Sequence, residues 1–408
     1  MPAKMLDRVP DATIETEAPR NPSLVLLSIV AVATGALVAN LYYAQPLIAA
    51  IGPAIGLSRE LSGAIVSITQ IGYGLGLFFL VSLADLVENK KLVLVMIGLT
   101  AVALAIAAAS TSAASFLIAS LVIGLCSTAA QVLVPFVSQL VAPERRGRVV
   151  GNVMAALLAG IMLARPVALF VAAAAGWRAI FWGSAVLMLG IGVALAKTMP
   201  RHKPSGGLHY GRIVASMAGL LLSIPQLRWR AAYQALLFAA FSLFWTIIPL
   251  ALVDRFGMGE SGIGLFALAG AGGALAAPIA GRVADRGFGQ VATAAAMATT
   301  AISFFATAWA VDAGALALLV VLAVLIDAAV QTNHIVSQRI IFSTPAATRG
   351  RVNALYMTFT FIGGAIGSML GTLIYHANGW SMTAVTGGFI AVVALMLFGL
   401  ERAGAAKR

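Results

Sequence analysis

Two charged residues inside long apolar segments are the first candidates for chemistry in this chain. Of the fourteen acidic residues, only Asp327 falls about midway along an apolar run, and Arg165 is the basic residue that lies deepest in another. A charge at the centre of a bilayer costs at least about 2.5–3.5 kcal/mol, so each of these needs a partner or a wet cavity. Opposite charges at such positions predict an ion pair that a substrate or a proton must break.

Depth along the predicted helices supports this pairing. Arg165 lies about 16 residues, or about 24 Å, from the inner end of its helix, and Asp327 lies about 15 residues, or about 22 Å, from the inner end of its own. An alternation between a paired and an open state would couple proton movement to transport. A static buried pair that only holds two helices together is the alternative interpretation.

Asp327 also begins a polar stripe. Asp327, Gln331, His334 and Gln338 are spaced i, i+4, i+7 and i+11, which puts them on one helix face. Such a face must meet protein or water rather than lipid. His334 could relay protons with Asp327 near neutral pH, or it could be a hydrogen-bonded packing residue. A third metal ligand is not evident, so neither a metal site nor a cofactor is predicted.

Other polar and aromatic residues could line a cavity with these charges. The residues predicted to bind substrate are Asn40, Tyr43, Gln70, Tyr73, Gln131, Trp245, Gln331 and Gln338. For those outside the stripe, hydrogen bonding or packing between helices is the alternative. Glycine clusters around Gly72 and Gly270 are interpreted as close-packing sites for helices rather than as nucleotide-binding loops.

The elements that must position these residues are membrane helices. The chain of 408 residues is 61% hydrophobic and 10% charged, with a mean hydropathy of +0.99, whereas soluble domains carry about a quarter charged residues. Apolar runs lie at about 24–50, 61–83, 92–110, 113–141, 149–175, 178–198, 230–253, 261–281, 291–310, 314–342, 352–376 and 381–400. Only helices or closed barrels span lipid, and the runs do not alternate with period two, so an all-α membrane protein with twelve transmembrane helices is predicted.

The distribution of basic residues predicts the orientation. With the N-terminus in the cytoplasm, 21 of the 26 Lys and Arg residues fall in the tails and inner loops, and 3 fall in outer loops. Cytoplasmic loops carry this excess, so both termini are expected in the cytoplasm. Although the net charge is +12, it is scattered over short loops, which argues against a nucleic-acid partner.

An internal repeat divides the chain into two halves. Three landmarks recur at an offset of 203 residues: Arg146-Gly147-Arg148-Val149 with Arg349-Gly350-Arg351-Val352, Gly176-Trp177 with Gly379-Trp380, and Pro46 with Pro249. Two parallel six-helix repeats are the architecture of alternating-access carriers. At the same offset Arg165 corresponds to Ser368 and Asp327 to Gly124, so the scaffold is duplicated but the charges are not.

These patterns predict five segments. They are a cytoplasmic N-terminal tail (1–23), a first half (24–198), a cytoplasmic linker (199–229), a second half (230–400) and a cytoplasmic tail (401–408). In the linker, Ile213 and Met217 share a helical face opposite Arg212, which favours an interfacial helix over a disordered linker.

The loop motifs carry a family resemblance. Residues 82–91 approximate the loop 2–3 signature of the major facilitator superfamily, residues 281–287 approximate its second copy, and residues 40–47 resemble the first helix of bacterial drug, sugar or amino-acid efflux permeases. The chain therefore resembles that superfamily over its full length. The loop pattern and the lack of targeting features in the sequence predict a multi-pass protein of the bacterial inner membrane.

Charged residues at the inner helix ends have a mechanical interpretation. Linked across helix ends, they could latch the inner face shut, although the arginines could equally serve only to set topology. The predicted gating set is Asp85, Arg146, Arg148, Asp285, Arg349 and Arg351.

Two departures from the family pattern bear on coupling. The fourth-helix motif has an Arg four residues before a Gly, where this chain has Ser120 before Gly124. The antiporter motif of the fifth helix has Gly-Pro, where this chain has Arg165-Pro166. Both departures weaken an inference of standard drug–proton antiport.

Three function hypotheses follow. The first is a secondary active transporter that moves a small organic solute by alternating access, in proton-coupled efflux. The second is an uncoupled or uptake carrier for an anionic small molecule that uses Arg165. The third, a membrane receptor or sensor, is remote, and an enzyme is not predicted because no nucleophile–base pair or metal set is present. The expected partners are the solute, protons and lipid, and a monomer suffices because one chain holds both halves.

Overall fold

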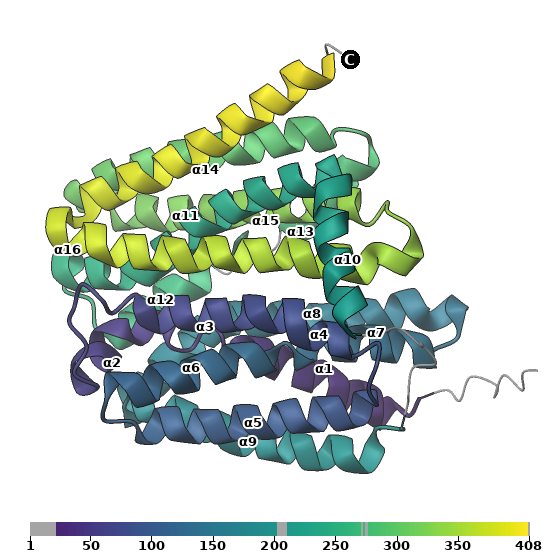
Figure 1. Ribbon diagram of the computed structural model, residues 1–408. Coiled ribbons are helices and arrows are strands. Elements are labelled where there is room, and N and C mark those ends of the chain that lie inside the picture. Colours follow the sequence, from purple (N-terminus) through teal and green to yellow (C-terminus); the bar gives the residue numbers. More distant parts are fainter. Residues whose placement is uncertain (1–21, 202–209, 271, 274–275, 407–408) are drawn as a thin grey trace, which may run out of the picture.

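The computed structural model describes residues 22–201, 210–270, 272–273 and 276–406, and among these the regular elements are all helices. They form two groups, with α1 to α9 in one and α11 to α16 in the other (Figure 1). Between them runs α10 (Tyr210–Ser223), which contacts α4 of the first group and α11 and α16 of the second. Ile213 and Met217 of α10 are buried, and the rest of the predicted linker includes residues outside those described.

The first group covers the first six apolar runs. Its helices are α1 (Leu24–Ala39), η1 (Gln45–Leu47), α2 (Ile48–Ala54), α3 (Ala64–Leu75), the π-helix η2 (Gly76–Leu80), α4 (Val81–Leu83), α5 (Asn89–Ala109), α6 (Ala113–Ser127), α7 (Ala129–Leu140), α8 (Pro143–Ala175) and α9 (Trp177–Thr198). The first run is interrupted between α1 and η1. Pro46 lies directly after this break, and its ring and missing N–H cannot continue a regular helix.

The second group covers the remaining runs. Its helices are α11 (Pro225–Phe256), α12 (Glu260–Gly270), α13 (Ala276–Asp285), α14 (Gly289–Asp312), α15 (Leu316–Ile341) and α16 (Ala346–Ala406). Gly379 has a φ of 74°, which divides α16 into two helical parts, because this left-handed conformation favours glycine.

Nine helices within the described ranges are long and apolar enough to cross a membrane. The segment Thr348–Gly404 is one of them although it includes the turn at Gly379, and α1, with 16 residues, is too short to be included. Large apolar side chains such as Val186, Ile302 and Leu400 are exposed on the outside, as expected where lipid is the solvent. The chain is an all-α membrane protein.

The two groups repeat one close contact between helices. A Cβ atom on Gly72 of α3 would collide with the carbonyl oxygen of Leu121 in α6. A Cβ on Gly273 would come within 2.9 Å of the carbonyl oxygen of Val324 in α15. Leu121 and Val324 are separated by the repeat offset of 203 residues, so the duplicated sequence builds duplicated packing.

Most basic side chains lie at one end of both groups, which we call the basic end. It includes the junctions α7–α8, α13–α14 and α15–α16, with Arg145, Arg148, Arg286 and Arg349 exposed there. Arg230 differs from expectation, since it is buried at the start of α11, where it donates to the hydroxyl of Thr293 at 2.9 Å.

Candidate functional site

A cavity of about 970 Å³ lies between the two groups. Helices α7 and α8 of the first group and α11, α15 and α16 of the second supply most of its lining. Its walls are largely apolar and aromatic, and include Tyr42, Tyr73, Phe238, Phe241 and Phe361. This size and character suit an organic molecule.

Arg165 lines the cavity from α8 and is only 5% exposed. Its Nε donates a hydrogen bond to Oε1 of Gln45 at 2.9 Å, while its buried Nη2 has no hydrogen-bond partner. The guanidinium carbon lies 5.0, 5.2 and 4.8 Å from the ring centroids of Tyr42, Phe241 and Trp245. Aromatic faces attract a desolvated cation, so three rings and one amide stabilise this charge and leave both N–H groups of Nη2 available.

Asp327 lines the same cavity from α15 and is partly exposed to it. Its Oδ1 accepts a hydrogen bond from the indole Nε1 of Trp245 at 2.7 Å. The predicted direct ion pair with Arg165 is not among the ion pairs within 4.0 Å in the described part of the chain. Trp245 contacts both residues instead, and the two charges lie close enough to interact electrostatically.

Two glycines make room for this arrangement. A Cβ on Gly270 would collide with the indole of Trp245, and a Cβ on Gly273 would collide with the Cβ of Asp327. The glycine cluster that the sequence indicated as a packing site therefore also shapes the cavity wall.

The polar stripe of α15 faces the cavity, where Gln331, His334 and Gln338 join Asp327 in its lining. The Nδ1 atom of His334 lies 3.0 Å from the hydroxyl of Tyr356, and the two rings stack with centroids 5.6 Å apart. No hydrogen bond joins His334 to Asp327 within the described part of the chain, where Asp327 accepts from Trp245.

The other residues predicted to bind substrate divide into two sets. Tyr73 and Gln131 line the cavity and share a hydrogen bond of 3.2 Å. Four lie outside its lining, namely Asn40, Tyr43, Gln70 and Trp245. Of these, Asn40 accepts from Ser184 at 2.6 Å and Gln70 donates to Ser242 at 2.9 Å. Each makes a hydrogen bond to a neighbouring helix, while Nδ2 of Asn40 and Oε1 of Gln70 are buried without a hydrogen-bond partner in the described structure.

A hydrogen-bonded network closes the site away from the basic end. We call Gln45, Gln70, Ser242, Thr246 and Ser368 the polar seal. Gln45 donates to Thr246 at 3.1 Å, Thr246 lies 3.0 Å from Ser368, and Ser368 lies 2.7 Å from Ser242. Gln70 donates to Ser242, so the network joins the first half to the second at two points and continues through Gln45 to Arg165.

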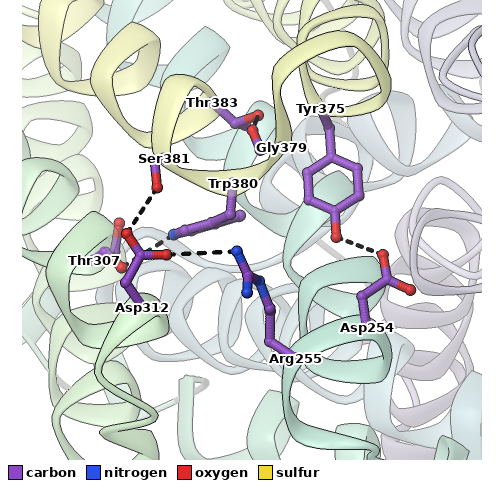
Figure 2. Close-up of polar contacts among 9 residues, drawn as sticks. All are labelled: Asp254, Arg255, Thr307, Asp312, Tyr375, Gly379, Trp380, Ser381 and Thr383. Atoms are coloured by element: carbon purple, nitrogen blue, oxygen red, sulfur yellow. Dashed lines mark hydrogen bonds and ion pairs between the residues drawn. The ribbon is translucent and has the colours of Figure 1, made fainter.

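Helix ends beyond the seal are also tied together. Asp312 accepts a hydrogen bond from Ser381 at 3.0 Å and lies 3.7 Å from Arg255 (Figure 2). Trp380 donates to the carbonyl oxygen of Thr307 at 3.1 Å. Tyr375 donates to Asp254 at 2.7 Å. These contacts are made within the second half, so they can persist when the halves move.

The cavity reaches the basic end, where its lining includes Asp85, Arg349 and Arg351 of the predicted gating set. Arg351 donates to Ser216 of α10 at 2.6 Å, and Arg349 donates to the carbonyl oxygen of Thr344 at 2.9 Å. Partial burial raises the pKa of Asp85, and the charge of Arg351 opposes that rise. Asp285 forms an ion pair with Arg339 rather than with the Arg349 and Arg351 pair, and Arg146 and Arg148 are exposed.

Comparison with known proteins identifies the family. The chain matches the sequence model described as "Major Facilitator Superfamily" over residues 27–333 and 231–408. The chain belongs to this superfamily. It is 39% identical over 390 residues to the "Uncharacterized transporter YgaY" of Escherichia coli O157:H7, with 95% of this chain and 98% of that protein covered. It is 32% identical over 408 residues to the "Probable transporter SCO4007" of Streptomyces coelicolor, with 96% and 93% covered.

Solved structures of other superfamily members share the fold. A mutant of the nucleoside transporter NupG superposes with a TM-score of 0.73 at 13% identity, covering 93% of this chain and 99% of that one. A bacterial homologue of the human lysosomal transporter Spinster, in an inward-facing and unoccupied conformation, gives 0.71 at 13% identity, covering 92% and 96%. Identities this low establish the fold alone.

Sequence reasoning missed several residues that form the site. Gln45, Tyr42 and Phe241 surround Arg165, and Ser242 and Thr246 belong to the polar seal. A signal for Tyr42 was present in the internal repeat, because Tyr42 lies 203 residues before Trp245, which was predicted, and both flank the guanidinium. Gln45, a polar residue beside Pro46 in an apolar run, was a second signal.

Proposed function

We propose that this membrane transporter is a proton-coupled exporter that moves a small organic solute by alternating access between its two halves, 24–198 and 230–400. The cavity extends to the basic end, and the positive-inside rule assigns that end to the cytoplasm. Solute would therefore enter from inside, while the polar seal closes the outer side. We also expect a single chain to work alone in the bacterial inner membrane, with lipid and protons as its other partners.

The observation that carries proton coupling is Asp327. Its carboxyl group lines the cavity, accepts one hydrogen bond from Trp245 and interacts electrostatically with Arg165. A carboxylate inside the membrane is stable only while it is balanced or protonated. Proton binding and solute binding at this group would exclude each other, which is the requirement for exchange.

The gating residues have a matching role in this proposal. When the outer side opens, the basic end must close, which would bring Asp85 of the first half toward Arg349 and Arg351 of the second. The equivalent contacts would bring Asp285 of the second half toward Arg146 and Arg148 of the first. His334 would sit beside the proton site as a hydrogen-bonded residue of the cavity wall.

The test measures solute-driven dissipation of a pH gradient in everted vesicles, with a broad panel of organic solutes. At matched expression, Asp327→Asn should abolish the response of every solute that is active with the wild type. Asp254→Asn is the control, since Asp254 also accepts a hydrogen bond from an aromatic donor (Figure 2). It lies outside the cavity lining. An undiminished response in Asp327→Asn would overturn the proposed coupling.

One observation favours a second candidate, an uncoupled or uptake carrier for an anionic small molecule. The unpartnered Nη2 of Arg165 offers a donor that an anion would satisfy. For this candidate, solute accumulation would be independent of the pH gradient and of Asp327, but lost in Arg165→Gln.

A further inference from the structure

We infer that the transported solute is a small zwitterion with an apolar body, whose anionic group binds Arg165 and whose ammonium group binds Asp327. The inference rests on the proposed function, because it names the substrate class of the same site. It comes from one unusual feature, namely two opposite charges in one cavity that are not paired with each other.

The Arg165 side supplies the anion site. Nη2 is buried and lacks a hydrogen-bond partner, while the side chain is held in place by Gln45 and three aromatic rings. A buried charged donor without an acceptor is unfavourable. A carboxylate in the cavity would remove this penalty with a charge-assisted hydrogen bond.

The Asp327 side supplies the cation site. A carboxylate has two oxygens and several acceptor positions, and Trp245 engages Oδ1 alone. Because the side chain is partly exposed to the cavity, an ammonium group can reach it. Trp245 contacts both charged residues, so the two binding points lie one side chain apart and a short molecule can carry both charges.

Binding of this kind agrees with exchange. An ammonium group at Asp327 occupies the position that a proton would otherwise take. The anionic group meanwhile compensates Arg165, so the solute as a whole adds no net charge to the buried site. A simple cation would leave Nη2 unsatisfied, and a simple anion would add a negative charge beside Asp327.

The aromatic wall indicates the nature of the solute body. Phe241, which lies against Arg165, stacks on Phe238 with ring centroids 5.3 Å apart. Phe238 packs on Phe361 at 5.3 Å, and Phe361 on Tyr73 at 4.5 Å. This wall starts at the anion site and follows the cavity, so an aromatic or branched aliphatic body would be buried along it.

The experiment uses two quartets of probes that differ in charge but share a body. The first contains phenylalanine, 3-phenylpropionate, 2-phenylethylamine and 3-phenylpropionamide. The second contains leucine, 4-methylpentanoate, isopentylamine and 4-methylpentanamide. Binding to the purified full-length chain in lipid nanodiscs is followed by tryptophan fluorescence, because Trp245 adjoins the site, and by thermal shift.

In the wild type, the zwitterion of at least one quartet should bind about tenfold or more tightly than its three analogues. Arg165→Gln should bind the zwitterion no better than the amine, and Asp327→Asn no better than the acid. Arg178→Gln and Asp254→Asn are matched controls, since Arg178 also stacks on a tryptophan and both residues lie outside the cavity lining. Both should retain the wild-type order.

Three outcomes would overturn the inference: in both quartets an acid, amine or amide that binds as tightly as its zwitterion, a preference unchanged by both site variants, or no binding in either quartet. Failure of the proposed function is separable. Proton-coupled transport of uncharged solutes would leave that function intact without this substrate class. Charge-selective zwitterion binding without proton movement would leave the substrate class intact without the coupling.

Discussion

The two halves of the molecule share a scaffold but not a chemistry. Both have a glycine turn before a tryptophan, with φ of 80° at Gly176 and 74° at Gly379. The repeat also supplies an aromatic residue from each half to Arg165. The arginine itself is not repeated, because the position in the second half that corresponds to Arg165 is Ser368. The helices and their turns are therefore repeated in both halves, whereas the charged residues of the site occur only once each.

Gly124 and Asp327 show the same division at one repeat position. A Cβ on Gly124 would collide with the carbonyl oxygen of Thr69, so the first half uses this position for close packing of α6 on α3. In the second half, Gly270 and Gly273 leave space, and the equivalent position carries a carboxylate that faces the cavity. An aspartate at position 124 should therefore disrupt the packing of the first half, whereas a glycine at position 327 should leave the second half folded.

The largest effect is expected for Gly124→Asp. The new side chain would separate α6 from α3 and bury an unpaired charge, at a combined cost of more than about 3 kcal/mol of folding free energy. We expect loss of folded protein in detergent, measured by size-exclusion chromatography and thermal unfolding. The reverse change, Asp327→Gly, should leave a folded protein that does not transport. Normal folding of Gly124→Asp would contradict the claim that the first half needs this position for close packing of α6 on α3.

The next largest effect distinguishes Gly72 from Gly273, which make equivalent close contacts in the two halves. Gly72→Ala and Gly273→Ala should each lower stability by about 1–3 kcal/mol, because each adds a methyl group to a close contact. Only the second displaces Asp327. Transport per folded molecule should therefore fall about tenfold, a barrier change of about 1.4 kcal/mol, in Gly273→Ala and stay near wild type in Gly72→Ala. Equal losses in both would mean that Gly273 acts through packing alone.

A smaller effect is expected where the halves meet. Gln45→Leu removes the links from Arg165 to Thr246, and a lost buried hydrogen bond costs about 1–3 kcal/mol. The sealed state should be disfavoured by a similar amount, which is roughly fivefold or more in population. The measurement is thiol labelling of Thr372→Cys, a buried position of α16 one turn after Ser368 that lies against Gly63 of the first half. The background is Cys126→Ala, which removes the single natural cysteine. Gln338→Leu, a change in the cavity wall, is the control and should not raise labelling.

The smallest effect concerns Asp85 at the basic end. Partial burial raises the pKa of Asp85 in the folded chain above its ordinary value, so the folded state binds the proton more readily than the unfolded state. Stability should then decrease as pH rises from about 4 through the raised pKa. Asp85→Asn should remove this slope in thermal unfolding curves, whereas Glu144→Gln, an exposed change at the start of α8, should keep it. A steeper slope in Asp85→Asn would contradict the sign.

Much of the fold was predictable because lipid restricts what a polypeptide can do. Apolar runs and the bias of basic residues follow from that restriction. The 203-residue repeat indicated two parallel halves, and the loop motifs carried the resemblance to the superfamily. The two isolated charges could also be found, because a charge in an apolar run is costly enough to require a reason. Helix α10 was visible as an amphipathic pattern in the linker.

The partners of these charges could not be predicted. Gln45 and Arg165 are 120 residues apart in the chain, and Trp245 and Asp327 are 82 apart, so their contacts depend on how helices cross. Spacing along one helix shows which face is polar but not which neighbour satisfies it. Asn40 and Gln70 were accordingly assigned to the cavity, although Ser184 and Ser242 bind them.

Proton release by the purified transporter tests the central claim most directly. A pH indicator in weakly buffered detergent solution would report protons released when a transported solute is added. The account predicts release from the wild type and from Asp254→Asn, and none from Asp327→Asn that still binds the solute. The same release from Asp327→Asn would contradict it, because the exchanged proton would then come from another group.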